Sequence, residues 1–486
     1  MKIKISIIIA VLILIVVSAS EKFFFSTKQI STPNIIKKRE IVERPNVIFI
    51  LVDTLRADYL GTYGFQGNIS PNIDAFAKKS LVFDRAITQA PWTKPSISSL
   101  FSGVNVVTHD LVQFVAERDS DGKLSEVYSL GNAGVTLAEA FKSNNYLAVG
   151  STDNVFVSNA FGLTRGFDSF QEARKWETDF NKSRGQRIYN EAKNWLTLDK
   201  KRSPFFLYLH FMDVHGPYTF DKDDFYELRG SKSLGSDSVL KESQIQKGLI
   251  EFPDWVKQED RYRVNTYRAA YAAGIKKFDR LFGSLIKFLE EEGYLENSIV
   301  VVTSDHGEEL MEYGRWDHGF SFYEILLQVP LLIYHPNFTM RNARTEHLVG
   351  LIDLFPTLMS LIGNKKSYEH LQGHDFSSII TGGQYQPQED LLTSGLRGEA
   401  NRNKFAYRTK NTKLLLNVDD ANQDSFFDLE KDPREYSPRK SGYDKTMRKK
   451  ATEKIRKLPT QAEFKKGRGV VSQDQINNLR SLGYLK

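Results

Sequence analysis

Apolar runs of strand length alternate with segments of helical periodicity from Asn46 onward. Near-continuous apolar runs of this kind predict central strands that helices cover on both faces. Residues 263–292 carry apolar side chains at helical spacing and predict one long amphipathic helix. We therefore expect an α/β fold with a large mixed, mainly parallel sheet flanked by helices. The strand candidates are residues 46–52, 146–150, 205–211, 298–303 and 330–334.

The pattern changes after Gly363, where the apolar runs become shorter and turn residues more frequent. Residues 405–409 and 413–418 predict short strands, and the Lys- and Arg-rich stretch 439–457 predicts a solvated helix. These features indicate a smaller C-terminal α+β subdomain. We place the catalytic domain at residues 45–365 and the C-terminal subdomain at residues 366–486.

The N-terminus carries Lys2 and Lys4 and then an uncharged apolar run over residues 5–20. The length of this run lies between that of a signal-peptide core and that of a membrane-spanning helix. We therefore interpret residues 1–20 as a signal peptide or an N-terminal membrane anchor, and the small residues 17–19 favour cleavage. Residues 21–44 are polar and Lys-rich and form a linker. Both interpretations predict export to the periplasm or the extracellular space, with membrane attachment through residues 5–20 if the segment is retained.

The amino-acid composition excludes several kinds of catalytic and binding chemistry. The chain has 486 residues and no cysteine, which excludes disulfides, thiolate metal sites and a cysteine nucleophile. The formal charge of +6, from 66 basic and 60 acidic residues, suits anionic partners. No nucleic-acid-binding motif accompanies this small excess, so we expect no nucleic acid as a partner.

Three of the predicted strands run into acidic and histidine residues. Asp53 follows the first strand, Asp213 and His215 follow residues 205–211, and Asp305 and His306 follow residues 298–303. Ligands bind beyond the carboxyl ends of strands in open α/β sheets, so these side chains predict a shared site. The alternative, that each aspartate only caps the next helix, suits a single loop better than three.

The segment APWTKPSISSL (residues 90–100) carries the candidate nucleophile, Thr93. Pro95 suits the first turn of a helix, which places Thr93 at a helix N-terminus that favours phosphate or sulfate. A threonine hydroxyl needs a metal ion or a base to become a nucleophile, and Asp53, Asp305 and His306 suit a divalent cation. Taken alone, the segment also fits a Pro-containing turn with a capping threonine.

The chain resembles the sulfatase family, within the alkaline-phosphatase superfamily. The resemblance extends from Asn46 to the C-terminus and implies an alkaline-phosphatase-like fold. The matching segments are NVIFILVDTLRADYLGTYG (46–64), APWTKPSISSLFSG (90–103), LHFMDVHGPY (209–218), VVTSDHGEELMEYGRWDHGFSFYE (301–324), VPLLIYHP (329–336), LIDLFPTLMSLIG (351–363), FDLEKDPRE (427–435) and LRSLGYL (479–485).

The resemblance implies a role for each candidate residue. Asp53, Thr93, Asp305 and His306 occupy the positions of a metal site, with Thr93 also in the nucleophile position. His215 and His318 match family histidines that contact the anionic group of the substrate or protonate the leaving oxygen.

Asp213 either joins His215 and His318 around a second metal or orients His215. We favour one divalent ion (Ca, Mg, Mn or Zn), because two-metal relatives space Asp213 and His215 more widely. Two residues apart on extended chain, these two side chains are expected to share a face.

The chain departs from the sulfatase pattern at the nucleophile. Sulfatases carry Cys or Ser there, converted to formylglycine, and then a Pro and an Arg. Here Thr93 and Ile97 take the first and last positions, and a Gly-Lys-x-x-His segment is replaced by residues 150–154 (GSTDN). Lys94 is a candidate source of the missing charge. A formylglycine hydrate ejects sulfate by collapsing to the aldehyde, whereas a phosphorylated threonine is turned over by in-line attack at phosphorus.

Three hypotheses remain. The first is a hydrolase or phospho-group transferase acting on phosphoesters through a Thr93 intermediate, with an anionic phosphate or sulfate ester as partner. The second is a sulfuric ester hydrolase without formylglycine. The third is a non-catalytic binding protein on the same fold, which has no need of the retained Asp, His and Thr set.

Overall fold

The computed structural model describes most of the chain from residue 44 onward. The expected signal peptide or anchor (1–20) and all but the last residue of the expected linker (21–44) lie outside the described residues. No helix in the described part of the chain is long and apolar enough to cross a bilayer. The described residues are 44–486 without 114, 119, 121–123, 132–133, 174–183, 199–203, 243–254, 258, 339–340, 399–400, 440–444, 460–463, 465, 483 and 486.

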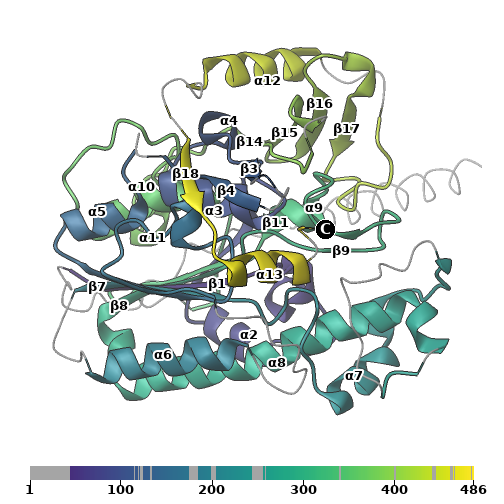
Figure 1. Ribbon diagram of the computed structural model, residues 1–486, viewed down its shortest axis with the longest axis horizontal. Helices are drawn as coiled ribbons and strands as arrows, with labels where there is room; N and C mark the ends of the chain where they lie inside the picture. The colour runs from purple at the N-terminus through teal and green to yellow at the C-terminus, as the bar shows by residue number, and fades with distance from the viewer. Residues whose placement is uncertain are drawn as a thin grey trace, which may run out of the picture. The chain divides into compact units, whose positions relative to one another are not determined.

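A mixed sheet forms the centre of the structure, and within the described residues it has nine strands (Figure 1). The central strand β1 (Asn46–Val52) pairs in parallel with β7 (Phe205–Phe211) on one side and β8 (Ser298–Thr303) on the other. Parallel pairing continues from β7 to β5 and β6, whereas β12 pairs antiparallel with both β8 and β2. The remaining strands are β2 (Leu81–Ile87), β5 (Leu147–Thr152), β6 (Ser169–Gln171), β11 (Gln328–Val329), β12 (Leu331–Tyr334) and β13 (Ala343–Gly350).

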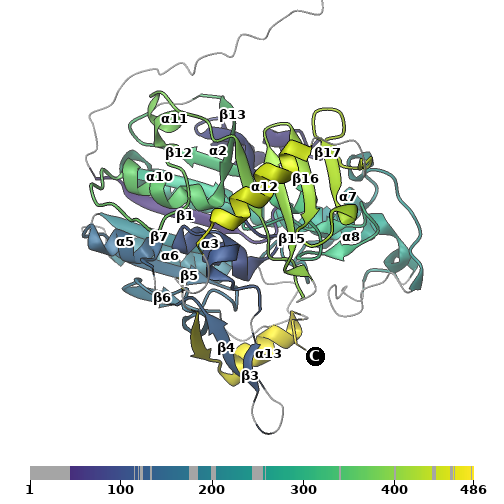
Figure 2. The same cartoon turned by 90° about the horizontal axis from the view of Figure 1, so that it is seen from above.

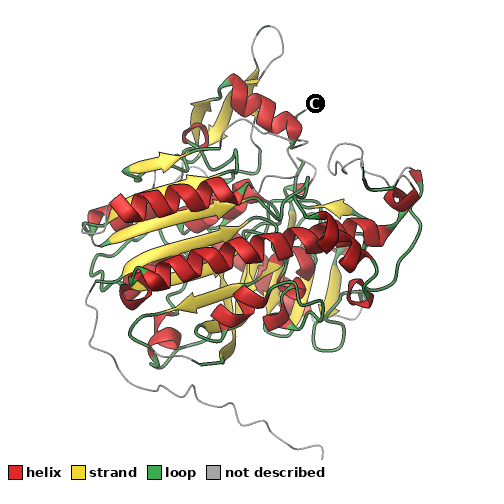
Figure 3. Ribbon diagram, turned by 90° about the horizontal axis from the view of Figure 1, so that it is seen from below, coloured by secondary structure: helices red, strands yellow, loops and turns green. Residues whose placement is uncertain are grey.

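Helices cover both faces of this sheet because the central strands are apolar on both sides. Alternate side chains of β1 belong to two separate apolar clusters, one with Val47, Phe49 and Leu51 and the other with Ile48 and Ile50. The first cluster packs against α3 (Thr93–Ser102), α5 (Leu137–Ser143) and α10 (Leu354–Leu361). The second packs against α2 (Pro71–Ala77), α6 (Gly185–Leu198) and α8 (Val264–Glu291), and Figure 3 shows α6 and α8 running along the strands.

A smaller antiparallel sheet follows, in the order β14–β15–β16–β17, and α12 (Lys445–Lys457) packs on it (Figure 2). Its buried charges connect it to the large domain. Glu324 of α9 (Glu324–Leu327) accepts from Arg408 (2.9 Å) and from Lys413 (3.1 Å). The strands are β14 (Asp390–Thr393), β15 (Lys404–Thr409), β16 (Thr412–Asn417) and β17 (Ser425–Asp428).

The chain then returns to the large domain. Strand β18 (Gly467–Val470) pairs with β4 (Leu124–Ser129), which also pairs with β3 (Val115–Arg118). Helix α13 (Gln473–Ser481) follows and lies beside β3 and β4 in Figure 2. The remaining helices and strands are α4 (Val106–His109), α7 (Lys222–Arg229), α11 (Ser377–Thr381), β9 (Glu309–Leu310) and β10 (Trp316–Asp317).

The structure confirms the predicted fold class. Strands β1, β7 and β8 have the predicted bounds, because buried parallel strands are apolar over their whole length. The predicted helix over residues 263–292 is α8, one residue shorter at each end. The predicted strands at 405–409 and 413–418 are β15 and β16 of the small sheet. The boundary between residues 365 and 366 stays a prediction.

Candidate active site

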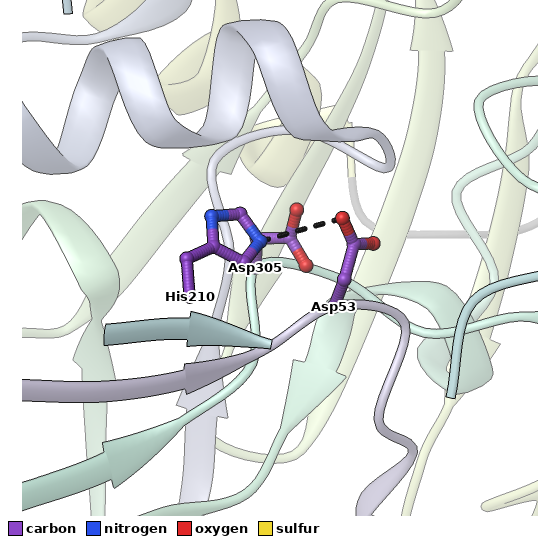
Figure 4. A group of neighbouring side chains, drawn as sticks. All are labelled: Asp53, His210 and Asp305. Atoms are coloured by element: carbon purple, nitrogen blue, oxygen red, sulfur yellow. Dashed lines mark ion pairs between the residues drawn. The ribbon is translucent and has the colours of Figure 1, made fainter. Parts of the chain in front are cut away.

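Strand β1 ends directly before Asp53, and its two parallel neighbours bring further polar side chains to the same edge of the sheet. His210 is the penultimate residue of β7, and Asp305 lies two residues beyond β8. Counting one ligand atom from each, Asp53, His210 and Asp305 lie within 4.8 Å of one another, and all three are buried. Figure 4 shows them converging, with Asp53 Oδ2 3.4 Å from His210 Nε2. The strand ends therefore form one compact group of candidate metal ligands.

Thr93 is the first residue of α3, and its hydroxyl faces this group. Its Oγ1 lies 3.2 Å from His306 Nε2 and 3.5 Å from Asp53 Oδ2. Ser96, in the first turn of the helix, donates to the backbone carbonyl of Asp305 (2.8 Å), which ties α3 to the loop after β8. The positive end of the helix dipole thus lies beside the carboxylates. Four residues that sequence reasoning selected for a metal site, Asp53, Thr93, Asp305 and His306, are in one place.

The protonation of His306 follows from its contacts. Its Nδ1 lies 2.8 Å from the Gly307 carbonyl, which only accepts, so Nδ1 carries the proton and Nε2 carries a lone pair. That Nε2 is 3.4 Å from Asp305 Oδ2 and 3.6 Å from Asp53 Oδ1. Neither of these two carboxylate oxygens accepts a hydrogen bond from the described residues. Two unpaired buried oxygens and an imidazole lone pair fit a divalent cation.

The electrostatics of the two aspartates support the same conclusion. Burial opposes ionisation of Asp53, but His215, His210 and His306 outweigh burial and hold the pKa of Asp53 below its usual value. Burial, together with the negative charge of Asp53, raises the pKa of Asp305 well above its usual value. Two buried carboxylates this close repel one another in the absence of a cation. A divalent ion would remove that repulsion.

Two members of this group were missed by sequence reasoning. His210 is fully buried, and its Nδ1 lies 3.0 Å from the hydroxyl of Tyr208. Asn154 follows β5 and donates from Nδ2 to Asp53 Oδ2 (2.6 Å). The available signal for His210 was a single polar residue within the apolar run FFLYLHF. Asn154 lies in the segment that replaces the expected Gly-Lys-x-x-His, and it carried no signal of its own.

His215 has one nitrogen fixed and the other without a partner. Its Nδ1 donates to the Gly216 carbonyl, and its Nε2 has no hydrogen-bond partner among the described residues. Burial lowers the pKa of His215, and the charge of Asp53 opposes that shift. The Nε2 of His215 is therefore available to a ligand, and it would contact an anionic group in its protonated form.

His318 also lies in the site, because its ring centroid is 4.4 Å from that of His306 and 5.2 Å from that of His215. Both of its nitrogens are engaged. Nδ1 lies 3.2 Å from Asp317 Oδ1, and Nε2 lies 3.1 Å from the hydroxyl of Tyr484. Burial raises the pKa of Tyr484, so this phenol is protonated and donates to Nε2.

The comparison with known proteins decides the family. The family model described as "Sulfatase" matches residues 45–364. The chain belongs to the sulfatase family. A second family model, "N-sulphoglucosamine sulphohydrolase, C-terminal", matches residues 311–463 of this sulfatase-family chain.

Relatives and solved structures agree with this membership. The arylsulfatase of Clostridium perfringens is 22% identical over 81% of this chain and 89% of its own length. The phosphonate monoester hydrolase of Agrobacterium radiobacter shares the fold with a TM-score of 0.67 at 20% identity, covering 87% of this chain and 96% of its own. A 2-O GAG sulfatase does so with a TM-score of 0.62 at 21% identity, covering 85% and 90%. The protein is thus an enzyme, a hydrolase of the sulfatase family, whose similar structures include phosphonate and sulfate ester hydrolases.

Asp213 belongs to neither of the two groups of candidate metal ligands among the described residues of this sulfatase-family chain. Residues 213–215 form a turn rather than extended chain, and His215 N donates to the Met212 carbonyl (3.1 Å). The expected shared face for Asp213 and His215 is therefore wrong. Asp213 Oδ2 lies against the start of α6, where a Cβ on Gly185 would be 2.4 Å away. Burial lowers the pKa of Arg184 to about 10, and the negative charges of Asp213 and Asp153 oppose that shift.

The cations near the nucleophile also differ from the sulfatase pattern. Ile97, in place of the usual arginine, is fully buried. Lys94 directs its Nζ to the Gln113 carbonyl (2.6 Å) and lies 5.2 Å from the centre of the Phe161 ring. At neither of these two positions of α3 does the structure place a positive charge against the metal group.

Arg397 brings a positive charge to this region from the loop after β14. Its Nη1 is 3.6 Å from Asp317 Oδ2, and its Cζ lies 4.4 Å over the ring of Tyr484 and 5.3 Å over that of Trp92. The charge of Arg397 contributes to the lowered pKa of both His306 and His318, after burial. No local sequence pattern marks Arg397. Tyr484 lies in the matching segment 479–485 but was assigned no role there, because it reaches the site through tertiary contacts alone.

Proposed function

We propose that this protein is an exported hydrolase of phosphoesters that uses Thr93 as a covalent nucleophile and one divalent metal ion. Asp53, Asp305 and His306 would hold the ion, with Thr93 beside it. The observation that supports the proposal most is the position of Thr93 Oγ1, 3.2 Å from His306 Nε2 and 3.5 Å from Asp53 Oδ2 at the start of α3. A bound divalent ion would lower the pKa of the Thr93 hydroxyl and offset negative charge.

The nucleophile favours phosphorus over sulfur. With threonine at position 93 and no cysteine in the chain, a formylglycine cannot form there. In the first step Thr93 Oγ1 loses its proton and bonds to phosphorus as the bond to the leaving oxygen breaks, and that oxygen takes a proton. Attack of water on phosphorus then breaks the Oγ1–P bond, and a proton of that water returns to Oγ1 as phosphate is released. An alcohol in place of water would give a phospho-group transferase.

The two histidines divide the remaining work. His215 Nε2 has no partner among the described residues, so it can contact the substrate. Because Nδ1 donates to Gly216, Nε2 gives a proton to the leaving oxygen only from the doubly protonated ring, which the negative charge of a bound ester would favour. His318 Nε2 accepts from Tyr484, so His318 acts through Tyr484 or after that hydrogen bond opens.

The second acidic group of the site does not require a metal ion of its own. Glu308, Asp317 and His318 also lie close enough together to bind a cation. Arg397 already provides positive charge there, with Nη1 3.6 Å from Asp317 Oδ2. This contact, and the separate position of Asp213, support one ion at Asp53, Asp305 and His306.

The proposed chemistry predicts a covalent phosphothreonine. We expect higher kcat/KM for aryl phosphates, phosphodiesters or phosphonates than for the matched aryl sulfate, assayed with Mg, Mn, Ca and Zn in turn. Acid quenching during turnover should trap phosphate on the peptide that contains Thr93, because a phosphate monoester of threonine is stable to acid. Mass spectrometry of the digested protein measures it.

Hydrolysis of sulfate esters is the second candidate function, and membership in the sulfatase family favours it. Turnover of sulfate esters alone, or turnover of phosphate esters without any modified Thr93 peptide, would overturn the phosphoester proposal. The corresponding peptide from Thr93→Ala serves as the control and should remain unmodified, since alanine has no hydroxyl to carry the group.

Export is the remaining part of the proposal, and it rests on the basic and apolar sequence of residues 1–20. When the protein is expressed in a bacterium and the cells are then fractionated, it should be recovered outside the cytoplasm. N-terminal sequencing should find a chain beginning near Ser20 if the segment is cleaved, or Met1 in the membrane fraction if it is retained. Recovery of the full-length chain in the cytosol would contradict export.

A further inference from the structure

One edge of the Arg397 guanidinium has no partner in the described structure. Its Nε and Nη2 are buried and donate to none of the described residues, whereas Nη1 lies 3.6 Å from Asp317 Oδ2. Nε and Nη2 lie on the same edge of the guanidinium plane. That edge donates two parallel hydrogen bonds to the oxygens of a phosphate, sulfate or carboxylate. Buried donors left without an acceptor are costly, so this edge is suited to a ligand.

The surrounding contacts hold Arg397 in one position. Its backbone N–H donates to the Gly319 carbonyl (2.7 Å), and its own carbonyl accepts from Asn401 Nδ2 (2.7 Å). Gly319 has a positive φ of 89°, and a Cβ there would lie 2.8 Å from Arg397 Nε. Glycine at this position therefore leaves room for the guanidinium. A preorganised cation loses less conformational entropy when it binds an anion.

Aromatic rings support the guanidinium and connect it to the nucleophile. Arg397 Cζ lies 4.4 Å from the centre of the Tyr484 ring and 5.3 Å from that of Trp92. Trp92 directly precedes Thr93, and its indole N–H donates to the Gly395 carbonyl (2.7 Å). The loop that carries Arg397 is thus tied to the residue before the nucleophile.

The balance of charges around the proposed metal position indicates that the Nε and Nη2 edge of Arg397 binds an anion. Asp53 and Asp305 place two carboxylates at the proposed metal position, so a bound divalent ion leaves little net positive charge for a dianionic substrate. Ile97 is apolar, and Lys94 donates elsewhere. Arg397 lies near enough for its charge to contribute to the lowered pKa values of His306 and His318.

We propose that Arg397 binds the tetrahedral oxyanion of the ester side-on, through Nε and Nη2, and takes the place of the cation that α3 lacks. Tyr484, three residues beyond the end of α13, positions Arg397 by packing its ring under the guanidinium. This inference rests on the proposed function for the identity of the substrate but not for the existence of the anion site. Phosphate and sulfate share the required geometry, and the assay distinguishes them.

The test measures anion binding apart from turnover. Inorganic phosphate, and inorganic sulfate in a parallel arm, are titrated into metal-loaded Thr93→Ala by calorimetry, with and without Arg397→Met. We expect Arg397→Met to weaken binding of the preferred anion on the order of 10- to 100-fold, because two charge-assisted hydrogen bonds are lost. Arg397→Lys should recover only part of this loss, because an ammonium ion cannot bind two oxygens side-on. Exposed Arg402, which pairs with Asp110 (3.5 Å), gives the matched control Arg402→Met.

Tyr484 is tested with two variants that separate its ring from its hydroxyl. Tyr484→Phe retains the ring and should keep anion affinity near that of the parent, whereas Tyr484→Ala should weaken it in the same direction as Arg397→Met. Equal effects of both variants would contradict a positioning role of the ring.

Unchanged anion affinity in Arg397→Met, with metal content and melting temperature retained, would overturn the inference. A loss confined to esters with one particular leaving group would also overturn it, because Arg397 would then bind the leaving part. If the parent binds phosphate through Arg397 but turns over no ester, the anion site stands and the proposed function fails.

Discussion

Thr93→Ala is expected to abolish ester turnover while the protein keeps its fold and its metal ion. Thr93 Oγ1 lies beside His306 Nε2 and Asp53 Oδ2, but both aspartates have other donors. Asp53 Oδ2 accepts from Asn154 Nδ2 (2.6 Å), and Asp305 Oδ1 accepts from the His306 backbone N–H (3.0 Å). Removing a covalent nucleophile should lower kcat on the order of 10⁴-fold or more. Steady-state kinetics measure this loss on the phosphate, phosphonate or sulfate ester with the highest kcat/KM. Elemental mass spectrometry measures the metal content of the variant.

Thr93→Ser is the matched control, since it keeps the hydroxyl and removes only a methyl group. We expect it to retain measurable activity and to form the corresponding covalent intermediate. A Thr93→Ala enzyme with unchanged kcat would refute the nucleophile assignment and would direct attention to a water molecule activated at the same group.

Asp305→Asn is expected to remove the stoichiometric metal ion and, with it, activity. The carboxylate of Asp305 provides one of the two oxygens that the described residues leave unpaired in the buried group. Ligand removal should weaken metal binding at least about 10- to 100-fold, as loss of even an outer-shell partner does. In the parent, chelation should lower the melting temperature, because the ion stabilises only the folded state and screens Asp53 from Asp305. In Asp305→Asn the chelator should have almost no effect.

Asp213→Asn separates a one-metal site from a two-metal site. Asp213 lies at the start of α6 near Arg184, so this variant should retain the full metal content of the parent. A parent protein with two ions, of which Asp213→Asn loses one, would contradict the single-metal proposal and restore Asp213 as a ligand. The melting temperature with and without chelator, measured by differential scanning fluorimetry, adds a second readout for Asp305→Asn and Asp213→Asn.

The central strands and the main acidic residues were predictable because the signals are local. Strands β1, β7 and β8 are apolar throughout, and a buried parallel strand needs that composition over its whole length. Asp53 directly follows β1 and Asp305 lies two residues beyond β8, so the parallel pairing of these strands places the two carboxylates together. Thr93 could be placed at a helix start from Pro95 and the following small residues.

Side-chain direction was less predictable than position. Asp213 was expected on the same face as His215, but the chain turns after β7 and separates them. Lys94 is adjacent to the nucleophile in sequence, yet its Nζ donates to Gln113. Such directions depend on where hydrogen-bond acceptors lie in space, and neighbouring residues in the sequence do not specify that.

The sequence by itself determined the α/β class, the sulfatase family and the departure at Thr93 and Ile97, because apolar periodicity, ordered motifs and residue identity can be read along the chain. Only the tertiary structure decided that Asn154 and His210 contact Asp53. It also decided that Arg397 contacts Asp317 and that Tyr484 contacts His318, both from the C-terminal part. The physical reason is that these contacts join residues from separate strands and loops. Their proximity results from sheet order and from the return of the chain through β18 and α13, which no local pattern encodes.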